Sequence, residues 1–347
     1  MGTKNPLHTP ICDLLHCDYP ILQAGMGGVA RAELVAAVVQ AGGYGFLGMV
    51  RETPELIAGE IKAVRARTNG MFGVNLIPSA TDPALFEAEL AVCLEHHVHS
   101  LCFFWDVVPD AIARAKAADC LVVYQVGSVR DAIAAEEAGA DIIIAQGVEA
   151  GGHVRGTVSS LVLLPQIVDA VSVPVVASGG FASGESLVAA LALGAQGIHC
   201  GTAFLATEES FAHSYHKRQI VCAESKDTVY TDAFSINWPP NSPVRVLRNC
   251  ITEDLGFHLT GHNPDDIRRV EIAREGDRPI YRYSTDSPLK NMTGNIEELA
   301  LFAGQVAGSI GNITTAKDRI DTIMQSAHRT MKRMGLSAAP RFTWQWA

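Results

Sequence analysis

The sequence has 347 residues, of which 48% are hydrophobic and 18% charged, as is typical of a folded α/β enzyme and not of a disordered chain. The formal net charge is -10 and there is no basic run, which argues against nucleic acid or an anionic membrane as a partner. No apolar run reaches the ~20 residues of a membrane helix, and the first residues show no signal-peptide pattern. The eight scattered cysteines are typical of reduced thiols, so the expected location is cytoplasmic.

One pattern repeats between residues 20 and 206: a short apolar run, a glycine or polar break, and an alanine-rich amphipathic stretch. The apolar runs lack the alternation of half-exposed strands, so they predict parallel strands that are covered on both faces. They span residues 20–25, 43–49, 72–77, 100–105, 121–126, 141–147, 174–180 and 196–206. The stretches between them predict helices; Thr53, for example, is a suitable N-cap before Pro54 at the first helical position.

Eight strands joined by helices predict an α/β fold, either a (β/α)8 TIM barrel or a doubly wound open sheet. The barrel is favoured because eight similar units fit into residues 20–206 and because phosphate-binding signals follow the seventh and eighth strands. These signals are Ser178-Gly179-Gly180 and Gly201-Thr202. Glycines there let backbone N–H groups approach a phosphate, although they could also serve only to permit tight turns.

The βα rhythm stops between residues 222 and 290, where charged residues and prolines become frequent. We therefore predict that residues 1–221 and 291–347 form the barrel with closing C-terminal helices. Residues 222–290 are predicted to form an inserted substrate or lid subdomain, the alternative being a solvated surface excursion. Two helices, over residues 296–310 and 315–334, are expected to close the domain.

The loop after the sixth predicted strand carries the most informative residues. It runs from Gln146 and ends in Gly151-Gly152-His153. A histidine among small residues at a barrel mouth can be reached by a substrate and can exchange protons near neutral pH. The neighbouring glycines would let a planar ring come close. The alternative is a loop histidine that only forms hydrogen bonds to the backbone.

The remaining motifs and histidines do not indicate a second catalytic or binding site. The GxGxxG at residues 43–48 follows a predicted helix and itself forms a predicted strand, whereas a dinucleotide-binding turn needs strand, glycines and then helix. His96, His97 and His99 are expected at a solvated helix end, and His199 is expected to be a satisfied core residue. No metal site is predicted, and no GxSxG elbow supports serine hydrolysis.

Taken together, the segments resemble the nitronate monooxygenase (2-nitropropane dioxygenase) family of FMN-dependent TIM-barrel flavoenzymes. The resemblance covers nearly the whole chain. It is carried by PILQAGMGGVA (20–30), GVNLIP (73–78), AQGVEAGGH (145–153), VPVVASGGFASG (173–184), ALALGAQGIHCGTAFLATEES (190–210) and GQVAG (304–308).

The resemblance implies FMN lying across the barrel mouth, with its isoalloxazine against the first loop and its phosphate in the two glycine turns. The residues that the resemblance assigns to FMN are Ala24, Gly25, Met26, Asn75, Gln125, Gln146, Gly151, Ser178, Gly179, Gly180, Gly201 and Thr202. Asn75 and Gln125 would form hydrogen bonds to the flavin. Gln125 stands where some relatives have lysine, which would leave less positive charge near the ring.

The activity that the resemblance implies is oxidation of alkyl nitronates or nitroalkanes by O2 to a carbonyl compound and nitrite. His153 would be the catalytic residue, either as a base that removes the α-proton of a neutral nitroalkane or, when protonated, as a group that binds the anionic nitro group. The alternative is an NAD(P)H-dependent flavin reductase of the quinone or enoyl-acyl-carrier-protein type, which shares the barrel and the AGGH-type loop. A flavin-free phosphate-binding barrel is a third option. The physiological substrate stays open, as does the oligomeric state, for which a homodimer is one option.

Overall fold

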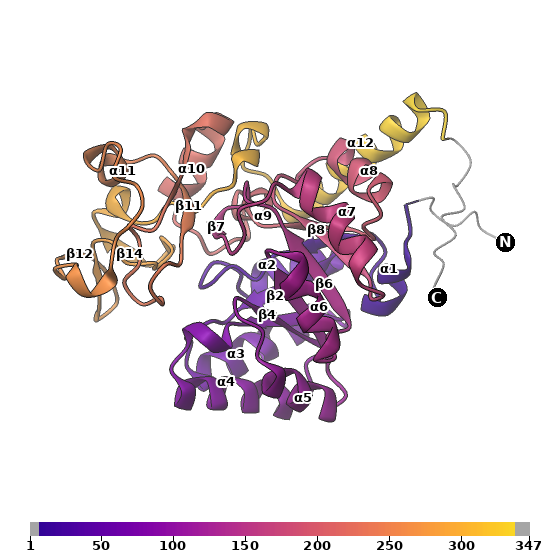
Figure 1. Cartoon of the computed structure of the whole chain (residues 1–347), viewed down its shortest axis with the longest axis horizontal. Coiled ribbons are helices and arrows are strands. Elements are labelled where there is room, and N and C mark those ends of the chain that lie inside the picture. The colour runs from indigo at the N-terminus through magenta and orange to yellow at the C-terminus, as the bar shows by residue number, and fades with distance from the viewer. Residues whose placement is uncertain (1–6, 337–347) are drawn as a thin grey trace.

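Eight parallel strands close into a barrel in the computed structural model of the protein, which describes residues 7–336 (Figure 1). In order around the barrel, the strands are β1 (Ile21–Gln23), β2 (Tyr44–Gly48), β3 (Gly73–Leu76), β4 (Ser100–Phe104), β5 (Leu121–Val126), β6 (Ile142–Gln146), β8 (Val175–Ser178) and β9 (Ile198–Cys200). The ring closes because β9 pairs in parallel with β1. The predicted (β/α)8 TIM barrel is confirmed.

Helices that follow the strands cover the outside of the barrel (Figure 1). They are α2 (Ala32–Gln40), α3 (Pro54–Arg65), α4 (Pro83–Glu95), α5 (Pro109–Ala117), α6 (Val129–Glu137), α7 (Ser160–Ala170) and α8 (Gly184–Ala192), with a 3-10 turn, η1 (Pro78–Ala80), before α4. The expected N-cap of α3 is present, since the Thr53 hydroxyl accepts a hydrogen bond from the N–H of Leu56 at 3.3 Å. None of the helices within residues 7–336 combines the length and the apolar character needed to cross a membrane.

A short helix, α1 (Pro10–Leu15), closes the end of the barrel where the strands begin. Its Ile11, Cys12 and Leu15 are fully buried in one cluster with inward-facing strand residues such as Leu22 and Tyr44. Burial of these side chains excludes water from the barrel interior. The opposite end, where the strands finish, is therefore the end that can hold a ligand.

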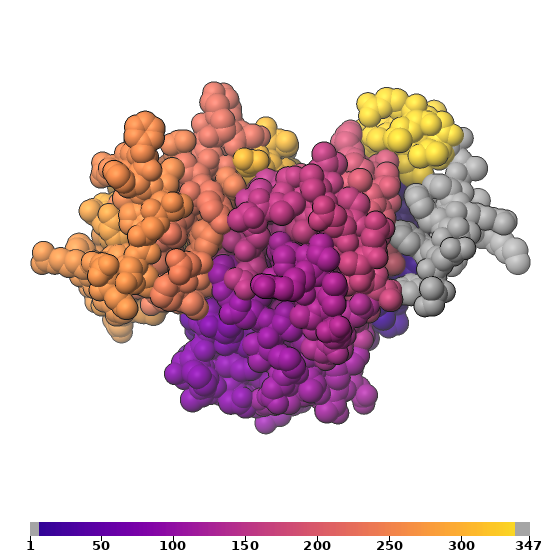
Figure 2. Space-filling model, in the orientation of Figure 1, coloured from indigo at the N-terminus to yellow at the C-terminus, as the bar shows by residue number. Residues whose placement is uncertain are grey.

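A small subdomain, defined here as residues 223–294, lies beside that open end (Figures 1 and 2). It contains α11 (Cys250–Asp254), the turns η2 (Ser225–Asp227) and η3 (Pro264–Asp266), and two three-stranded sheets. One sheet joins β10 (Thr228–Thr231), β11 (Val244–Leu247) and the barrel's own β7 (Gly152–His153), and the other joins β13 (Arg278–Tyr281), β12 (Glu271–Glu275) and β14 (Met292–Gly294). Since β14 pairs with β12, strand pairing in this subdomain extends past residue 290.

The segment after the small subdomain departs from the prediction. The prediction of a helix over residues 296–310 is wrong, because only two 3-10 turns form there, η4 (Ile296–Glu298) and η5 (Gln305–Ser309). Between them the chain is extended and pairs with β11: the Leu247 N–H donates to the Leu301 carbonyl at 2.8 Å, and Phe302 forms a bridge with Val246. Pairing with an open strand edge thus overrides the local helical pattern.

The other C-terminal helix is present as α12 (Ala316–Arg333), which packs against α8 and α2. The eighth predicted strand, residues 196–206, is shorter than expected. Its β9 portion ends at Cys200, and a single helical turn, α9 (Thr202–Leu205), follows before α10 (Ser214–Cys222). That turn directs backbone N–H groups towards the barrel mouth, as a helix N-terminus does.

Candidate active site

A cavity of about 730 Å³ lies between the barrel mouth and the small subdomain. Its walls come from the loops after the barrel strands and from the small subdomain, as expected for a TIM barrel. All thirteen residues singled out from the sequence line it, namely Ala24, Gly25, Met26, Asn75, Gln125, Gln146, Gly151, His153, Ser178, Gly179, Gly180, Gly201 and Thr202. The structure therefore brings these residues together, although they come from seven separate segments of the chain.

The floor of the cavity is a layer of uncharged polar side chains at the ends of the barrel strands. Asn75, at the end of β3, donates through Nδ2 to the Cys102 carbonyl at 3.0 Å, which leaves its Oδ1 free towards the cavity. Gln125, at the end of β5, lines the same floor. Such a layer offers donors and acceptors to the edge of a planar heterocycle and carries no charge of its own.

The turn after β8 has the geometry of an anion cradle. Gly179 and Gly180 have φ angles of 91° and 81°, which side chains rarely adopt, so glycine is required by the backbone there. The N–H groups of both residues, and that of Gly201 after β9, form no hydrogen bond within residues 7–336. Unpaired N–H groups on two adjacent turns fit the phosphate of a mononucleotide.

Close backbone approach also shapes the first loop. A Cβ atom on Gly25 would lie 2.2 Å from the Cβ of Asn75, so any side chain there would displace the asparagine. By contrast, a Cβ on Gly201 would meet Ala24 and Met26 only at 3.7 and 3.8 Å. Gly25 is therefore required by packing, whereas Gly201 borders open space in the cavity.

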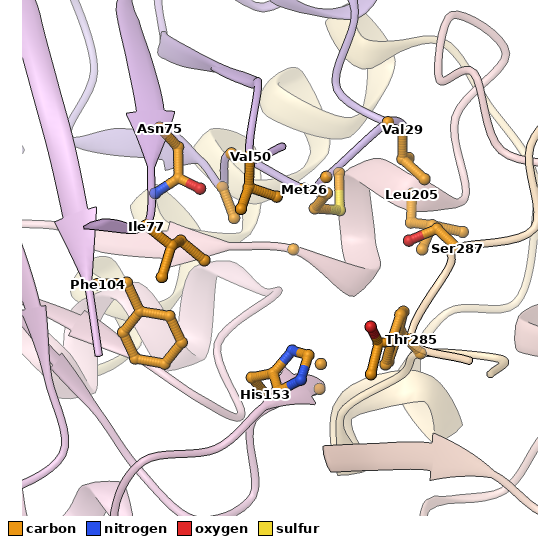
Figure 3. Close-up of a pocket in the computed structure, with 18 of the residues that line it drawn as sticks. Met26, Val29, Val50, Asn75, Ile77, Phe104, His153, Leu205, Thr285 and Ser287 are labelled. Carbon is orange, nitrogen blue, oxygen red and sulfur yellow. The ribbon is translucent and has the colours of Figure 1, made fainter. Parts of the chain in front are cut away.

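His153 projects into the cavity from β7, across from Asn75 and Met26 (Figure 3). The loop predicted here contains this two-residue strand, which pairs antiparallel with β11 so that His153 lies opposite Val244. The Gln146 side chain holds the loop at both ends: its Nε2 donates to the His153 carbonyl at 2.9 Å and its Oε1 accepts from the Arg155 N–H at 3.2 Å. Gln146 thus positions the imidazole, and both its amide nitrogen and its amide oxygen form hydrogen bonds to the loop.

Aromatic rings enclose the His153 imidazole. Trp238 of the small subdomain stacks on it, with ring centroids 3.3 Å apart and planes 15° apart, while Trp105 and Phe302 lie at 6.0 Å. Nε2 is buried and has no hydrogen-bond partner among the described residues. Burial, followed by the charge of Arg51, holds the pKa of His153 well below its usual value, so the ring is neutral at physiological pH.

A second imidazole lines the cavity beneath the first. His199 of β9 contacts Ser178 Oγ through Nδ1 at 3.1 Å, as expected for a satisfied core histidine, but its buried Nε2 has no partner within residues 7–336. Burial lowers the pKa of His199 to about 3, so it stays neutral. The expectation of a satisfied core residue is therefore only half correct. Because orphaned buried polar atoms are rare, this Nε2 fits a ligand resting on the cavity floor.

The predicted surface histidines lie away from this site. His96 caps the end of α4, and His97 follows it in a left-handed conformation with φ of 47°. His99 is half-buried at the start of β4, where its Nδ1 lies 3.0 Å from the Tyr44 hydroxyl. None of the three lines the cavity.

Sequence reasoning predicted a substrate or lid subdomain over residues 222–290 but could not say which of its residues line the cavity. The wall that the small subdomain supplies consists of Asn237, Trp238, Glu275, Arg278, Thr285, Asp286, Ser287, Leu289 and Met292. Arg278 is paired there with Glu275 at 2.7 Å and with Asp286 at 2.8 Å. Sequence reasoning also did not identify Arg51, which lines the cavity from the loop after β2. No periodicity or motif marks these residues, so only their position in space identifies them.

A barrel mouth that combines a polar floor, an imidazole and, after β8 and β9, N–H donors unpaired within residues 7–336 is that of a TIM-barrel enzyme with room for a phosphate-bearing ligand. The sequence model of the family "Nitronate monooxygenase" matches residues 8–326, and the chain belongs to this family. It is 35% identical to a probable nitronate monooxygenase of Staphylococcus aureus, over 83% of this chain and 93% of that protein.

Other relatives carry other names. The chain is 33% identical to the (3aS,4S,5R,7aS)-5-hydroxy-7a-methyl-1-oxo-octahydro-1H-indene-4-carboxyl-CoA dehydrogenase of Mycobacterium tuberculosis, over 92% of this chain and 96% of that protein. Among solved structures, FabK from Thermotoga maritima has a TM-score of 0.79 at 31% identity and covers 95% of this chain and 99% of its own. The nitroalkane oxidase of Streptomyces ansochromogenes has a TM-score of 0.76 at 30% identity and covers 94% of this chain and 99% of its own.

Proposed function

We propose that the protein binds FMN in this cavity and oxidises alkyl nitronates and nitroalkanes with O2 to a carbonyl compound and nitrite, with His153 as catalytic base. The observation that carries the proposal is the position of His153 in the cavity that also holds the unpaired N–H groups of the glycine turns, with its buried Nε2 lacking a partner in the described chain. Burial lowers the pKa of this imidazole, which keeps it neutral. A neutral imidazole can take a proton from carbon but gives an anion little attraction. Of the two roles open to His153, this favours the base over the anion-binding group.

The residues around the cavity fit FMN. The N–H groups of Gly179, Gly180 and Gly201 would hold the phosphate, and Asn75 and the Nε2 of the second imidazole would meet the ring system from the floor. When bound, the flavin supplies the electron acceptor that no side chain in the cavity can replace. The cofactor assignment can be tested directly, since a colourless purified protein that gains nothing from added FMN would support a flavin-free phosphate-binding barrel instead.

The chain's own contribution is to position the proton acceptor and to exclude water from it. The Gln146 side chain fixes the backbone on both sides of the imidazole. The rings of Trp105, Trp238 and Phe302 keep the imidazole in an apolar enclosure. This enclosure keeps the imidazole unprotonated and therefore able to act as a proton acceptor, while it also lowers the strength of the base.

An NAD(P)H-dependent flavin reductase is the second candidate. It is favoured by the relative from Mycobacterium tuberculosis, which is named a carboxyl-CoA dehydrogenase and is 33% identical over 92% of this chain. The FabK structure, with a TM-score of 0.79, also resembles this chain as closely as the nitroalkane oxidase does at 0.76. In that reaction the flavin would receive a hydride from a nicotinamide, and His153 would handle a proton of the acceptor substrate.

Anaerobic stopped-flow reduction separates the two candidates. The purified flavoprotein is mixed in parallel with propionate 3-nitronate, NADH and NADPH, and the flavin absorbance is followed. Rapid bleaching by the nitronate with slow bleaching by both nicotinamides is the expected result. Rapid bleaching by NADH or NADPH, with none by the nitronate, would establish the reductase.

A further inference from the structure

The cavity contains one cationic side chain that has no carboxylate partner. Among the described residues that line it, the only lysine or arginine residues are Arg51 and Arg278, and Arg278 is paired with both Glu275 and Asp286. Within residues 7–336 no carboxylate oxygen lies within ion-pair distance of the Arg51 guanidinium. The adjacent carboxylate, Glu52, is taken by Arg31 at 2.9 Å. Asp286, whose charge acts most strongly on Arg51, is held by Arg278.

The contacts that Arg51 does form place it beside the catalytic imidazole. Its guanidinium donates to the Asn237 carbonyl and, at 3.4 Å, to the Thr285 hydroxyl, both in the small subdomain. Asn237 directly precedes Trp238, the ring stacked on His153. The charge of Arg51 also reaches the imidazole, where it contributes to the lowered pKa of His153.

The backbone of Arg51 is unusual as well. Its φ is 58°, a left-handed conformation that long side chains seldom adopt and that tends to persist at functional sites. The strand before it, β2, ends at Gly48, so this turn aims the side chain from the barrel wall across to the small subdomain. A partly buried guanidinium that is bonded only to neutral oxygens keeps its charge and N–H donors for an anion, and Asp286, Glu89 and Glu52 act on it only from beyond ion-pair distance.

We propose that Arg51 binds the anionic group of the substrate, and that this group is a planar anion with two oxygens, a nitronate or a carboxylate. A guanidinium matches such a group through two parallel N–H donors, which an ammonium cannot do. The inference rests on the proposed function, because it divides the work at that site. Arg51 supplies the positive charge that the neutral His153 lacks, and His153 handles the proton.

The test compares Arg51→Gln and Arg51→Lys with the wild-type flavoprotein. The matched control is Arg130→Gln, which removes the same charge from a side chain that is 88% exposed on α6. Binding of sodium nitrate and of sodium acetate is measured by isothermal titration calorimetry, which needs no turnover. We expect Arg51→Gln to weaken nitrate binding by about 10- to 100-fold, Arg51→Lys by roughly 3- to 10-fold, and Arg130→Gln by less than about twofold.

Kinetics then identify which anion Arg51 meets. For ethyl nitronate, which has no carboxylate, a fall in kcat/KM of Arg51→Gln assigns Arg51 to the reacting nitronate. A fall with propionate 3-nitronate alone assigns it to the carboxylate, and both results support the proposal. Unchanged affinity for nitrate and acetate in both Arg51 variants overturns it, even if nitronate turnover is normal. Arg51-dependent anion binding without any nitronate oxidation would instead refute the proposed function and leave this inference standing.

Discussion

The barrel and the small subdomain both line the cavity, but they contribute different chemistry. The barrel provides backbone N–H groups, tight glycine turns, uncharged polar side chains and, in the loop after β2, Arg51. The small subdomain provides the stacked Trp238 and a charged cluster around Arg278. We propose that the first kind of surface holds a cofactor's phosphate and ring, and that the small subdomain, together with Arg51, contacts the substrate. Cofactor binding and most of the substrate contacts would then come from different parts of the fold.

His153 belongs to both parts. It leaves the barrel in the loop after β6, yet its strand β7 pairs with β11 of the small subdomain, and its ring stacks on Trp238. The residue proposed to carry the chemistry therefore sits where cofactor and substrate surfaces meet. The predictions that follow test each side of this division.

The largest effect is expected from the residue shared by the two regions. His153→Asn should retain FMN and lose about 10²- to 10⁴-fold in kcat on neutral nitroalkanes, because it removes the base. In the wild type, the lowered pKa of His153 means that the base stays unprotonated, so kcat/KM should remain level as pH falls from 8 to 6.5. Steady-state assays over this range check both points. Undiminished turnover by the variant would exclude the base role.

The second-largest effect is expected for FMN binding by the barrel. Gly25→Ala should weaken FMN binding by roughly 10- to 100-fold, because its Cβ would lie 2.2 Å from that of Asn75 and must displace it. Gly59→Ala in α3 is the matched control: nothing lies within 4 Å of its Cβ, and a helical alanine should raise the free energy of unfolding by up to about 1 kcal/mol. Fluorescence titration with FMN and thermal melts measure the two quantities. Equal FMN affinity in both variants would show that the contact is not needed.

Stability towards acid depends on two buried histidines outside the small subdomain, His199 of β9 and His216 of α10. Burial lowers the pKa of His199 to about 3 and that of His216 to about 4, in both cases below the ordinary 6.5. A lowered folded-state pKa means that the unfolded chain takes up the proton first. The contribution of these two neutral histidines to the free energy of unfolding is therefore complete above pH 6.5. It is lost as pH falls from 6.5 towards 4, by up to about 1.4 kcal/mol per pH unit for each residue.

Denaturant unfolding at pH values between 7 and 5 measures this slope. His216 bonds the Phe302 carbonyl at 3.0 Å, behind the small subdomain, and His216→Gln keeps a donor without a titrating ring. That variant should lose stability less steeply with acid than the wild type. A slope identical to that of the wild type would contradict the prediction.

The smallest effect tests the small-subdomain side. Trp238→Ala should lower kcat/KM by roughly tenfold and move the acid limb of the pH profile to higher pH, because water reaches His153 and its pKa rises. Trp238→Phe keeps an aromatic face on the imidazole and should change kcat/KM by less than about threefold. If the acid limb of the alanine variant does not move, the stacking ring does not set the protonation of His153.

Sequence reasoning worked well where a feature depends on residues adjacent in the chain. The Thr53 cap, the glycine turn after β8 and the parallel strands all follow from local patterns, and the structure has them. It failed for residues 296–310, whose helical pattern gives way to pairing with β11. Sequence reasoning predicted His199 to be a core residue, because the residues adjacent in the chain do not reveal that its Nε2 lacks a partner within residues 7–336.

The sequence by itself determined the barrel, its family and the loop that carries His153, because strand periodicity and glycine turns are encoded by short stretches of chain. Only the tertiary structure decided that burial keeps the imidazole neutral and that Arg51 lacks a carboxylate partner within residues 7–336. Protonation and pairing depend on what other segments bring nearby, and Trp238 and Arg278 reach the site from more than 80 residues further along the chain than His153. Burial and charge are properties of that assembled neighbourhood, not of any one stretch of residues.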